Sequence, residues 1–587
     1  MIFHFSSKEY SKICFTFIVF LFFGCLSIPE TAQKTLYGPE IEEILSGLVG
    51  SKSKSITFAF QDGLDIKESG FLGKETKPHR YKIGSVTKLF TTIAVLQLRD
   101  RGKLSLDDPL ARYIPELKKI PKQNKNARDF TIRDVLKHQS GLPSDLSYEF
   151  FLDSASKYTD IQKARIRSLS ILKDSQTAEP GQYTSYSNLG FGLLGILIER
   201  TSNLDIETYF QKNIFEVAGM EHSSLVDEAQ STALIDGYEG ILFSSKVPKP
   251  IIRDLTAGSL STTGADMQRF FAAFFRSKQN RNGLISANSF REMHRLQSPS
   301  PLDFSFQIGL TVMLDDFQSN GKSVKLAFHS GSLPPYAAHW LYDPESEISV
   351  FIAGNQFPAH IQDIPGSAEK IFKVLWKKRF GNEIHSVQDK KSLRKSIFRP
   401  GLYASSNGII EVKEEGEKRE LIFSGLPLQI EEKDGAFYLR LKAFFGLFDL
   451  TPKELESWIV EMEETSKETI LTLQSSSLKK GVAGVGILNI AQTNQIDSKY
   501  LGTYRNLEAF PILTKVNLYF KDNQYCVIAV NYRLANWNSK VDYLCKVLDP
   551  ETLLIEGKGR NLNEIIKLKE KDGKVILVHS GVNFEKD

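Results

Sequence analysis

The stretch YKIGSVTKLF, residues 81–90, places a serine and a lysine three positions apart, Ser85 and Lys88, at the head of an apolar run. Positions three apart on a helix are neighbours, with about 5 to 6 Å between Cβ atoms, so the hydroxyl and the amine can meet. The spacing alone is not specific, because Ser51 and other serines of the chain also have a lysine three residues later. The apolar residues from 86 to 98 recur at helical spacing on nearly all sides, which predicts a buried helix. This context separates the pair from the one at Ser51, which lies in the polar run GSKSKS.

The predicted burial of Lys88 gives the pair a chemical meaning. A serine acts as a nucleophile when a neighbouring group takes its proton, and a lysine takes that proton only while its amine is neutral. A desolvated position at the positive N-terminal end of a helix favours the neutral amine. The sequence therefore permits Ser85 to act as a nucleophile with Lys88 as its proton acceptor.

Two further motifs carry polar side chains that could face the same cleft. In EPGQYTSYSNLGFGLLG, residues 179–195, a turn leads to Tyr186 and Asn188 directly before a second buried helix. In LAFHSGSLPPY, residues 326–336, a predicted strand bears His329, Ser330 and Gly331, and the glycine would let a substrate approach the backbone closely. The amide of the neighbouring residue, Ser332, could complete an oxyanion hole.

The composition is that of an ordinary globular protein of 587 residues, and its length predicts two or three domains. The formal net charge is +4 without the basic stripe that nucleic acid requires, so no nucleic-acid partner is expected. The 4 cysteines, Cys14, Cys25, Cys526 and Cys545, provide neither a disulfide scaffold nor a cysteine-rich zinc site. No metal and no cofactor are therefore predicted.

The first 25 residues have the charge-then-apolar order of a secretory signal, with Lys8 and Lys12 before an apolar run from Ile13 to Gly24. The run is shorter than the roughly 20 residues that a membrane-spanning helix needs. It ends at Cys25 in a sequence that resembles the lipobox of bacterial lipoproteins, where the cysteine is acylated. Two interpretations stay open, a lipid anchor on Cys25 or simple cleavage of the signal. Both predict a protein outside the cytoplasm, in the cell envelope or periplasm or secreted.

The distribution of strands and helices predicts an α+β fold for residues 26–380. Strand-like runs occur near the start, in SITFAFQDGLDIKESGFLG (residues 55–73), and return in KLAFHSG, AAHWLYD and EISVFIAGN, between residues 325 and 355. Helical patterns occupy the sequence between them. One antiparallel sheet assembled from the two ends of this segment and flanked by helices is the expected architecture.

A charged stretch at residues 381–396 is typical of a linker, and the pattern behind it changes to short alternating runs. Two C-terminal all-β domains are predicted, over residues 397–492 and 498–587, each barrel-like or sandwich-like. The triplets Gly401-Leu402-Tyr403 and Gly502-Thr503-Tyr504 form a weak internal echo. Cys526 and Cys545 lie in adjacent strand-like runs, and a disulfide and two separate buried thiols both stay open.

Several longer segments resemble one known family. GKLSLDDPLARYIPEL, FTIRDVLKHQSGLP, the segment around Tyr186, and AGSLSTTGADMQRFF are similar to recurrent segments of the class C β-lactamase-type serine hydrolases, and occur in the family's order. That family includes penicillin-binding D,D-peptidases, D-aminopeptidases and β-lactamase-like esterases. The resemblance spans roughly residues 40 to 380 and implies a β-lactamase/transpeptidase-like fold.

The resemblance also implies roles for the residues of the three motifs. Ser85 would be the nucleophile, and Lys88 and Tyr186 would share the general acid and base work. Asn188 would position the amide or ester group of the substrate. The backbone amides of Ser85 and Ser332 would form the oxyanion hole, and His329 and Gly331 would line the substrate site.

The third motif departs from the family pattern at His329, where β-lactamases most often have a lysine. A titratable side chain thus replaces a permanent cation at the edge of the predicted cleft. This favours an exported esterase or peptidase, acting through an acyl-enzyme on Ser85 on an ester, amide or D-amino-acid peptide, over a true β-lactamase. The alternative is a β-lactamase or penicillin-binding D,D-carboxypeptidase. Neutral esters are accordingly expected to react better than penicillins at neutral pH.

A hypothesis of another class is a non-catalytic binding protein that keeps the fold. The joint presence of Ser85, Lys88, Tyr186 and Asn188 favours the enzyme. The expected partner is a small-molecule or peptidoglycan-like peptide substrate, and contact with a membrane is expected only through a lipid on Cys25.

Two other histidines are interpreted as structural. His138 lies in a family segment that supports the fold, and the sequence His579-Ser580-Gly581 repeats the third motif without the surrounding family segments. No chemistry is therefore predicted in either β domain. The region after about residue 395 is expected to be dispensable for the chemical step.

Overall fold

The computed structural model describes most of the chain from residue 38 onward. The described ranges are 38–49, 54–74, 77–122, 125–153, 155–172, 177–226, 232–240, 244–297, 307–387, 397–443, 448–464, 469–474, 481–486, 496–509, 511–521, 525–534 and 537–587. The predicted signal segment with Cys25, and residues 388–396 of the predicted linker, lie outside these ranges. Among the described residues, no helix combines the length and apolar character that crossing a membrane requires.

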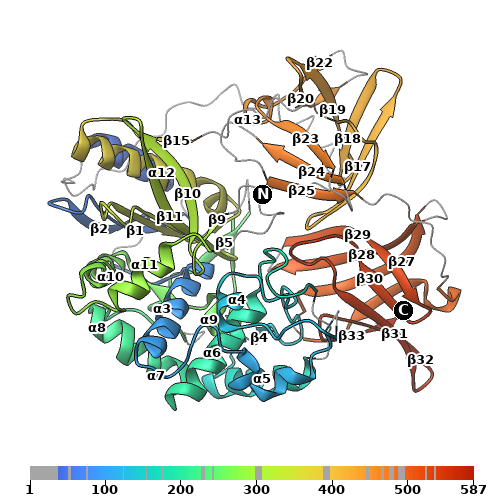
Figure 1. The fold of residues 1–587 in the computed structure, drawn as a ribbon, viewed down its shortest axis with the longest axis horizontal. Coiled ribbons are helices and arrows are strands. Elements are labelled where there is room, and N and C mark those ends of the chain that lie inside the picture. The colour runs from blue at the N-terminus through green and yellow to red at the C-terminus, as the bar shows by residue number, and fades with distance from the viewer. Residues whose placement is uncertain are drawn as a thin grey trace.

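The first part of the described chain is an antiparallel sheet with helices on both faces, as the sequence predicts (Figure 1). β1 from the start of the chain pairs with β13 from the end of this part, with Phe58 opposite Ile352. The sheet is thus assembled from the two ends of the segment, and the predicted α+β class is confirmed. From one edge to the other its strands are β15 (His385–Ser386), β10 (Met313–Ser319), β11 (Lys322–Leu333), β12 (Tyr336–Tyr342), β13 (Ser349–Gly354), β1 (Ile56–Gln61) and β2 (Lys67–Leu72), with β9 (Gln307–Ile308) paired to β10.

Both faces of the sheet are covered, because alternate residues of a strand point to opposite sides. Phe58 and Phe60 of β1 belong to an apolar core shared with α2 (Pro39–Gly47) and α12 (Ala359–Phe380). Ala59, between them, belongs to the larger core shared with the helices of the other face. This explains why every residue of β1 is buried.

The helical region between β2 and β9 contains the elements that carry the predicted site. Its central helix, α3 (Thr87–Asp100), is buried from Thr87 to Leu98 and packs against α6 and α9, as its all-round apolar pattern predicts. The other helices are α4 (Ile132–Leu136), α5 (Tyr158–Ile171), α6 (Asn188–Ser202), α7 (Ile206–Phe210), α8 (Glu216–Ala218), α9 (Leu255–Gly258), α10 (Gly264–Arg276) and α11 (Ala287–His294), with short turns η1 (Gly84–Val86), η2 (Leu110–Arg112), η3 (Pro115–Lys119), η4 (Gln211–Phe215) and η5 (Ser277–Gln279). Short strands pair as β3 (Tyr81–Lys82) with β8 (Ser261–Thr262), β4 (Phe151–Leu152) with β7 (Ile251–Ile252), and β5 (Gly237–Glu239) with β6 (Ser245–Val247) and β14 (Gln356–Phe357).

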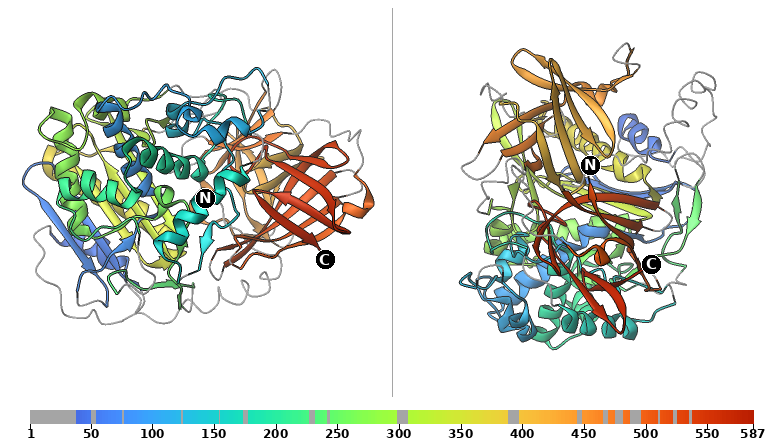
Figure 2. Two further views of the ribbon diagram at one scale, coloured as in Figure 1. Left: turned by 90° about the horizontal axis from the view of Figure 1, so that it is seen from below. Right: turned by 90° about the vertical axis from the view of Figure 1, so that its right-hand side faces the viewer.

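The C-terminal part consists of two closed eight-stranded barrels, which lie on the same side of the sheet-and-helix body (Figures 1 and 2). The first contains β16 (Gly401–Ser405), β17 (Gly408–Glu415), β18 (Lys418–Phe423), β19 (Leu426–Lys433), β20 (Ala436–Arg440), β23 (Ile459–Glu464), β24 (Thr469–Gln474) and β25 (Gly481–Gly486), beside the hairpin β21 (Lys442–Ala443) and β22 (Phe448–Asp449) and the helix α13 (Lys453–Glu456). The second follows the turn η6 (Ser498–Tyr500) and contains β26 (Gly502–Asn506), β27 (Leu513–Lys521), β28 (Tyr525–Leu534), β29 (Trp537–Asp549), β30 (Thr552–Ile555), β31 (Ile565–Lys571), β32 (Lys574–His579) and β33 (Val582–Lys586). The predicted all-β class of this part is confirmed, and both units are barrels.

The similarity between the triplets that begin at Gly401 and Gly502 has a structural basis in the first strand of each barrel. The hydroxyl of Tyr403 donates to the carbonyl of Arg399 at 2.7 Å, and the hydroxyl of Tyr504 donates to the carbonyl of Tyr500 at 2.6 Å. In both barrels a buried tyrosine of the first strand therefore binds the backbone four residues before it, where the chain enters the barrel. Cys526 and Cys545 lie opposite each other on β28 and β29 as buried thiols that are not joined by a disulfide.

The second barrel packs against residues 144–150 of the helical region, called here the docking segment. Ser147 donates its backbone N–H to the Ser580 carbonyl at 3.0 Å, and Asn561 donates its own to Ser144 Oγ at 2.8 Å. The first barrel contacts the second, where the Tyr543 hydroxyl donates to the Ser406 carbonyl at 3.2 Å. The second barrel is therefore the one that reaches the helical region beside the predicted site.

Candidate active site

Ser85 and Lys88 meet at the N-terminal end of α3. Ser85 lies in η1, half-buried between fully buried neighbours, and the Lys88 side chain is completely buried. Lys88 Nζ lies 3.1 Å from Ser85 Oγ, 2.7 Å from Asn188 Oδ1 and 2.6 Å from the carbonyl oxygen of Ala257. A neutral amine has two hydrogens, and the two carbonyl-type oxygens accept both of them. Its lone pair is then left for the Ser85 hydroxyl.

The environment of Lys88 favours this neutral amine. Burial holds the pKa of Lys88 well below its ordinary value, and the positive charge of Arg560 lowers it further. The carboxylates of Asp145 and Asp254 act in the opposite direction with smaller effect. Burial thus shifts Lys88 toward the neutral form that a proton acceptor needs.

Tyr186 and Asn188 lie at the start of α6, where Ser187 is the N-cap and accepts the Gly190 N–H at 3.0 Å. Burial raises the pKa of Tyr186, and a hydrogen bond with Ser85 offsets only part of this effect, so the phenol keeps its proton. Its ring lies 4.8 Å from Lys88 Nζ. Tyr186 is therefore placed as a proton donor beside the nucleophile.

Two glycines bring the backbone amides of Ser85 and Ser332 to the same space. A Cβ atom on Gly331 of β11 would lie 3.0 Å from the Ser85 nitrogen and 1.8 Å from the Ile83 carbonyl oxygen. A Cβ atom on Gly84 would lie 2.5 Å from the Ser332 nitrogen. Only glycines permit this close approach of η1 and β11, which brings the backbone of Ser332 against the turn that carries Ser85.

His329 differs from the sequence expectation of a titratable side chain at the edge of the cleft. It is only 2% exposed, and its Nδ1 lies 2.7 Å from the carbonyl oxygen of Ser330. Burial and the nearby Lys88 lower its pKa to about 3. His329 is therefore neutral throughout the physiological range, because the packing of β11 removes it from water.

Three residues that the sequence analysis left out of the site lie against it. The His138 ring stacks on Tyr186 with 4.2 Å between ring centroids, and its Nδ1 accepts the Ser187 N–H at 3.1 Å. Asp145 Oδ1 accepts from Asn188 Nδ2 at 2.9 Å. His138 thus fixes the ring of Tyr186, and Asp145 fixes the side-chain amide of Asn188.

The third residue is Arg560, from the loop between β30 and β31 of the second barrel. Its Nη2 lies 3.3 Å from Asp145 Oδ2, and its Cζ lies 5.4 Å from the centre of the Tyr186 ring. The second barrel thus places a side chain against the site, although the sequence predicts no chemistry in either β domain. No local signal marks this arginine, because its surroundings, GKGRNLNE, have the composition of a polar loop.

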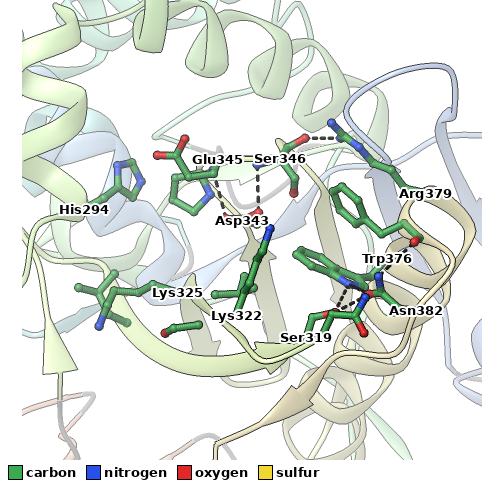
Figure 3. A pocket seen from close by; sticks show the side chains of 16 residues that line it. His294, Ser319, Lys322, Lys325, Asp343, Glu345, Ser346, Trp376, Arg379 and Asn382 are labelled. Atoms are coloured by element: carbon green, nitrogen blue, oxygen red, sulfur yellow. Dashed lines mark hydrogen bonds between the residues drawn. The ribbon is translucent and has the colours of Figure 1, made fainter.

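A separate hollow of about 800 Å³ lies between the β10–β11 hairpin, the residues after β12 and the end of α12 (Figure 3). Asp343, Trp376 and Arg379 contribute to its walls. The guanidinium of Arg379 is bound by the carbonyls of Asp62 and Ser346. The described residues that line this hollow include none of the predicted site residues. In the described ranges no group of three or more His, Cys, Asp or Glu side chains could hold a metal ion.

This fold is that of the β-lactamase-type serine hydrolase superfamily, and comparison with known proteins agrees. The model of the Beta-lactamase family matches residues 66–366, more than half of the chain. The chain belongs to the Beta-lactamase family. Its members share the serine-hydrolase fold, as the sequence resemblance implies.

Individual relatives are distant. "Protein flp" of Staphylococcus aureus (strain COL) is 24% identical over 290 residues, which are 48% of this chain and 54% of that protein. "Beta-lactamase-like protein 2" of Dictyostelium discoideum is 29% identical over 231 residues, 36% of this chain and 41% of that protein. The chain thus spans about half the length of the curated relatives it matches, or less. The crystal structure of SurE has a TM-score of 0.53 at 18% identity, covering 76% of this chain and 97% of SurE, which shows a shared fold.

Proposed function

We propose that this protein is a serine hydrolase that forms an acyl-enzyme on Ser85 with an ester, amide or D-amino-acid peptide substrate. The observation that carries the proposal is the buried Lys88 amine, 3.1 Å from Ser85 Oγ, with both hydrogens of its neutral form engaged elsewhere. The half-buried position of Ser85 leaves the nucleophile open to a substrate.

The reaction follows from the positions of these groups. Ser85 Oγ attacks the carbonyl carbon of the substrate while Lys88 takes the hydroxyl proton. The backbone amides of Ser85 and Ser332 stabilise the negative oxygen of the tetrahedral intermediate. Tyr186 gives its phenol proton to the leaving group, and Lys88 returns a proton to the phenolate. Water then attacks the acyl-enzyme by the reverse sequence and releases the acid.

A fluorophosphonate probe tests this proposal, because it phosphonylates an activated serine. The intact chain should be labelled on the peptide that contains Ser85, and Ser85→Ala should remove the label. Ser330→Ala is the matched control, because Ser330 Oγ interacts with His339 Nδ1 at 2.8 Å and is not beside Lys88. An unlabelled intact chain would favour the non-catalytic binding protein, and a label that persists in Ser85→Ala would contradict the assignment.

We further propose that the protein is exported, with Cys25 as the site of a lipid anchor or with simple signal cleavage. The support is the order of Lys8, Lys12 and the following apolar run, together with the lipobox-like sequence at Cys25. Fractionation of a bacterial host should place the mature chain outside the cytoplasm. Cys25→Ala should release it from the membrane fraction only if the lipid anchor is present. A chain that stays in the cytoplasm at full length would contradict export.

A further inference from the structure

Of three basic side chains at the site, two are buried and the third, Arg560, is exposed. Lys88 and His329 are both buried, and burial lowers the pKa of each. Arg560 keeps its charge, because a guanidinium is not deprotonated in proteins. The guanidinium lies over the ring of Tyr186, with 5.4 Å between Cζ and the ring centre, and its charge lowers the pKa of both Tyr186 and Lys88.

The contacts of Arg560 leave most of its donors available for a ligand. A guanidinium has five N–H donors in a planar fork. In the described part of the chain, its side-chain hydrogen bond is the one to Asp145, at 3.3 Å. The side chain is 46% exposed and lies over the face of Tyr186. Asp145 therefore holds the guanidinium in position and leaves its other N–H donors for an anion.

The position over Tyr186 indicates which part of a substrate would reach Arg560. In the proposed reaction Tyr186 protonates the leaving group, so a cation beside its ring lies on the leaving-group side of Ser85. A carboxylate is the group that a guanidinium fork binds through two parallel hydrogen bonds. The guanidinium lies 5.4 Å from the centre of this ring, so a carboxylate bound to it would belong to the part of the leaving group near the scissile linkage.

We propose that Arg560 of the second barrel is the substrate-binding cation of this site and selects acyl substrates whose leaving group carries a carboxylate next to the scissile bond. This inference rests on the proposed function and specifies its substrate class. A peptide cleaved before its C-terminal residue, or the corresponding ester of a hydroxy acid, has this chemistry. The third motif has no cation at His329. Arg560, which lies 415 positions after Asp145 in the sequence, thus supplies one. The expected preference for neutral esters is replaced by a preference for anionic leaving groups.

Two thioesters of benzoylglycine test the proposal, one with thioglycolate and one with methyl thioglycolate as leaving group. The two differ only in the carboxylate, and the released thiol measures the turnover of both. Arg560→Gln should lower the ratio of kcat/KM values, anionic over neutral, about tenfold, which corresponds to about 1.4 kcal/mol. Arg560→Lys should retain part of the preference, because it keeps the charge but not the fork. The ratio cancels any effect of Arg560 on Lys88, since both substrates share it.

The matched control is Arg505→Gln in β26 of the same barrel, where the arginine pairs with Asp587. The ratio of kcat/KM values, anionic over neutral thioester, should be the same in Arg505→Gln as in the unaltered protein. An unchanged ratio in Arg560→Gln would overturn the proposal. If Arg560→Gln does not fold, the ratio in the unaltered protein should still fall as salt is added, and a ratio independent of salt would overturn it equally.

A second measurement covers the case in which neither thioester is turned over. N-acetylglycine should slow labelling of Ser85 by the fluorophosphonate more than its methyl ester does, and Arg560→Gln should abolish the difference. Equal protection by the two compounds in the unaltered protein would contradict the carboxylate site. An unaltered protein that is not labelled at all would refute the proposed hydrolase instead, so the two failures are distinguishable.

Discussion

The two barrels have the same closed eight-stranded form and the same tyrosine hydrogen bond, yet among the described residues only those of the second lie against the candidate site. The clearest comparison is between two serine-glycine turns. Ser424-Gly425 joins β18 to β19, and Ser580-Gly581 joins β32 to β33, with positive φ angles of 50° and 79° in the first turn and 50° and 77° in the second. Positive φ at both positions is what a tight two-residue hairpin requires. The local conformations are therefore matched.

The surroundings of the two turns are different. Ser424 and Gly425 are exposed, whereas Ser580 is buried against the docking segment. The Ser580 hydroxyl donates to the Asp145 carbonyl at 3.0 Å and accepts the Ser147 N–H at 3.0 Å. A turn that is an ordinary hairpin end in one barrel is a docking contact in the other. The difference teaches that the role of each barrel is set by what its loops touch, not by its fold.

Removing the second barrel is expected to have the largest effect. Asn561 holds Ser144, and the Ser144 carbonyl accepts the Asn188 N–H at 2.8 Å, so loss of the barrel loosens a residue that contacts Lys88. A chain ending near residue 390 should acylate with p-nitrophenyl acetate about 100-fold more slowly, as small misplacements of catalytic groups do. An internal deletion of residues 397–486, bridged by a flexible linker, should leave this rate unchanged. Stopped-flow release of nitrophenol measures both.

This expectation reverses the one from sequence, in which the region after about residue 395 is dispensable. If the chain ending near residue 390 folds and acylates at the full rate, the docking segment does not depend on the second barrel. Neither barrel would then affect the acylation rate, and the functional difference drawn between the two barrels would be wrong.

The glycines of the two turns provide a finer test. A Cβ atom on Gly581 would lie 2.4 Å from Leu146 Cδ1, whereas one on Gly425 would meet nothing within 4 Å. Both alanine substitutions cost the same backbone strain, since the φ angles agree. Gly581→Ala should therefore lower the free energy of unfolding by about 2 kcal/mol more than Gly425→Ala does, the typical cost of overpacking. Urea denaturation of the two variants gives the difference, and equal losses would show that the second barrel does not pack on Leu146.

Alanine substitutions of the two turn serines should differ less in their effect on the free energy of unfolding. Ser580→Ala removes the hydroxyl that bonds Asp145 and Ser147, but the Ser147 N–H keeps the Ser580 carbonyl as an acceptor at 3.0 Å. A loss of about 1 kcal/mol of unfolding free energy is expected, the net value of a typical hydrogen bond. Ser424→Ala, on an exposed turn, should change it little. Thermal denaturation of both variants checks the pair, and a larger loss in Ser424→Ala would contradict the assignment of the contact.

The smallest expected effect concerns Glu508, in the loop after β26 that faces the docking segment. Burial, with a smaller contribution from the charge of Glu149, raises its pKa to about 7, while the Glu149 N–H and Arg253 act in the opposite direction. The folded state thus binds a proton that the unfolded state releases above pH 4.5. The stabilisation is complete below that pH and is lost as the pH rises through about 7.

Glu508→Gln should therefore raise the melting temperature at pH 8 and leave it unchanged at pH 5. The gain should stay below about 1 kcal/mol, because the carboxyl is half-buried and partly screened by water. Glu415→Gln, on an exposed position of the first barrel, is the matched control. Parallel curves at both pH values would show that Glu508 is not buried in the interface.

The fold and the local part of the site could be predicted from the sequence, because their signals lie within short segments. Ser85 and Lys88 are three positions apart on one helix, and the apolar residues that bury them follow directly. Tyr186 and Asn188 stand at the start of another helix with its own apolar pattern. The sheet from two ends of the chain follows from strand-like runs at those ends.

The rest of the site depends on packing between segments that are distant in the sequence, and such packing leaves no local sequence signal. Arg560 lies in a polar loop and Asp145 in a short turn, and neither pattern predicts that they meet. The neutral state of His329 depends on its burial, which a strand sequence with histidine and serine does not reveal. His579-Ser580-Gly581 has the letters of the third motif, but its serine and glycine form a docking turn.

The separation of 415 positions between Asp145 and Arg560 has a consequence for the order in which this protein is made. Domains fold as units while the chain is synthesised from its N-terminus. The segment with Ser85 and Lys88 emerges first, and its reactive pair can assemble before the guanidinium has been translated. Under the two proposals, the support of Asn188 and the substrate-binding cation arrive together with the second barrel, so the newly made chain would gain its full acylation rate and its discrimination between substrates in the same step of synthesis.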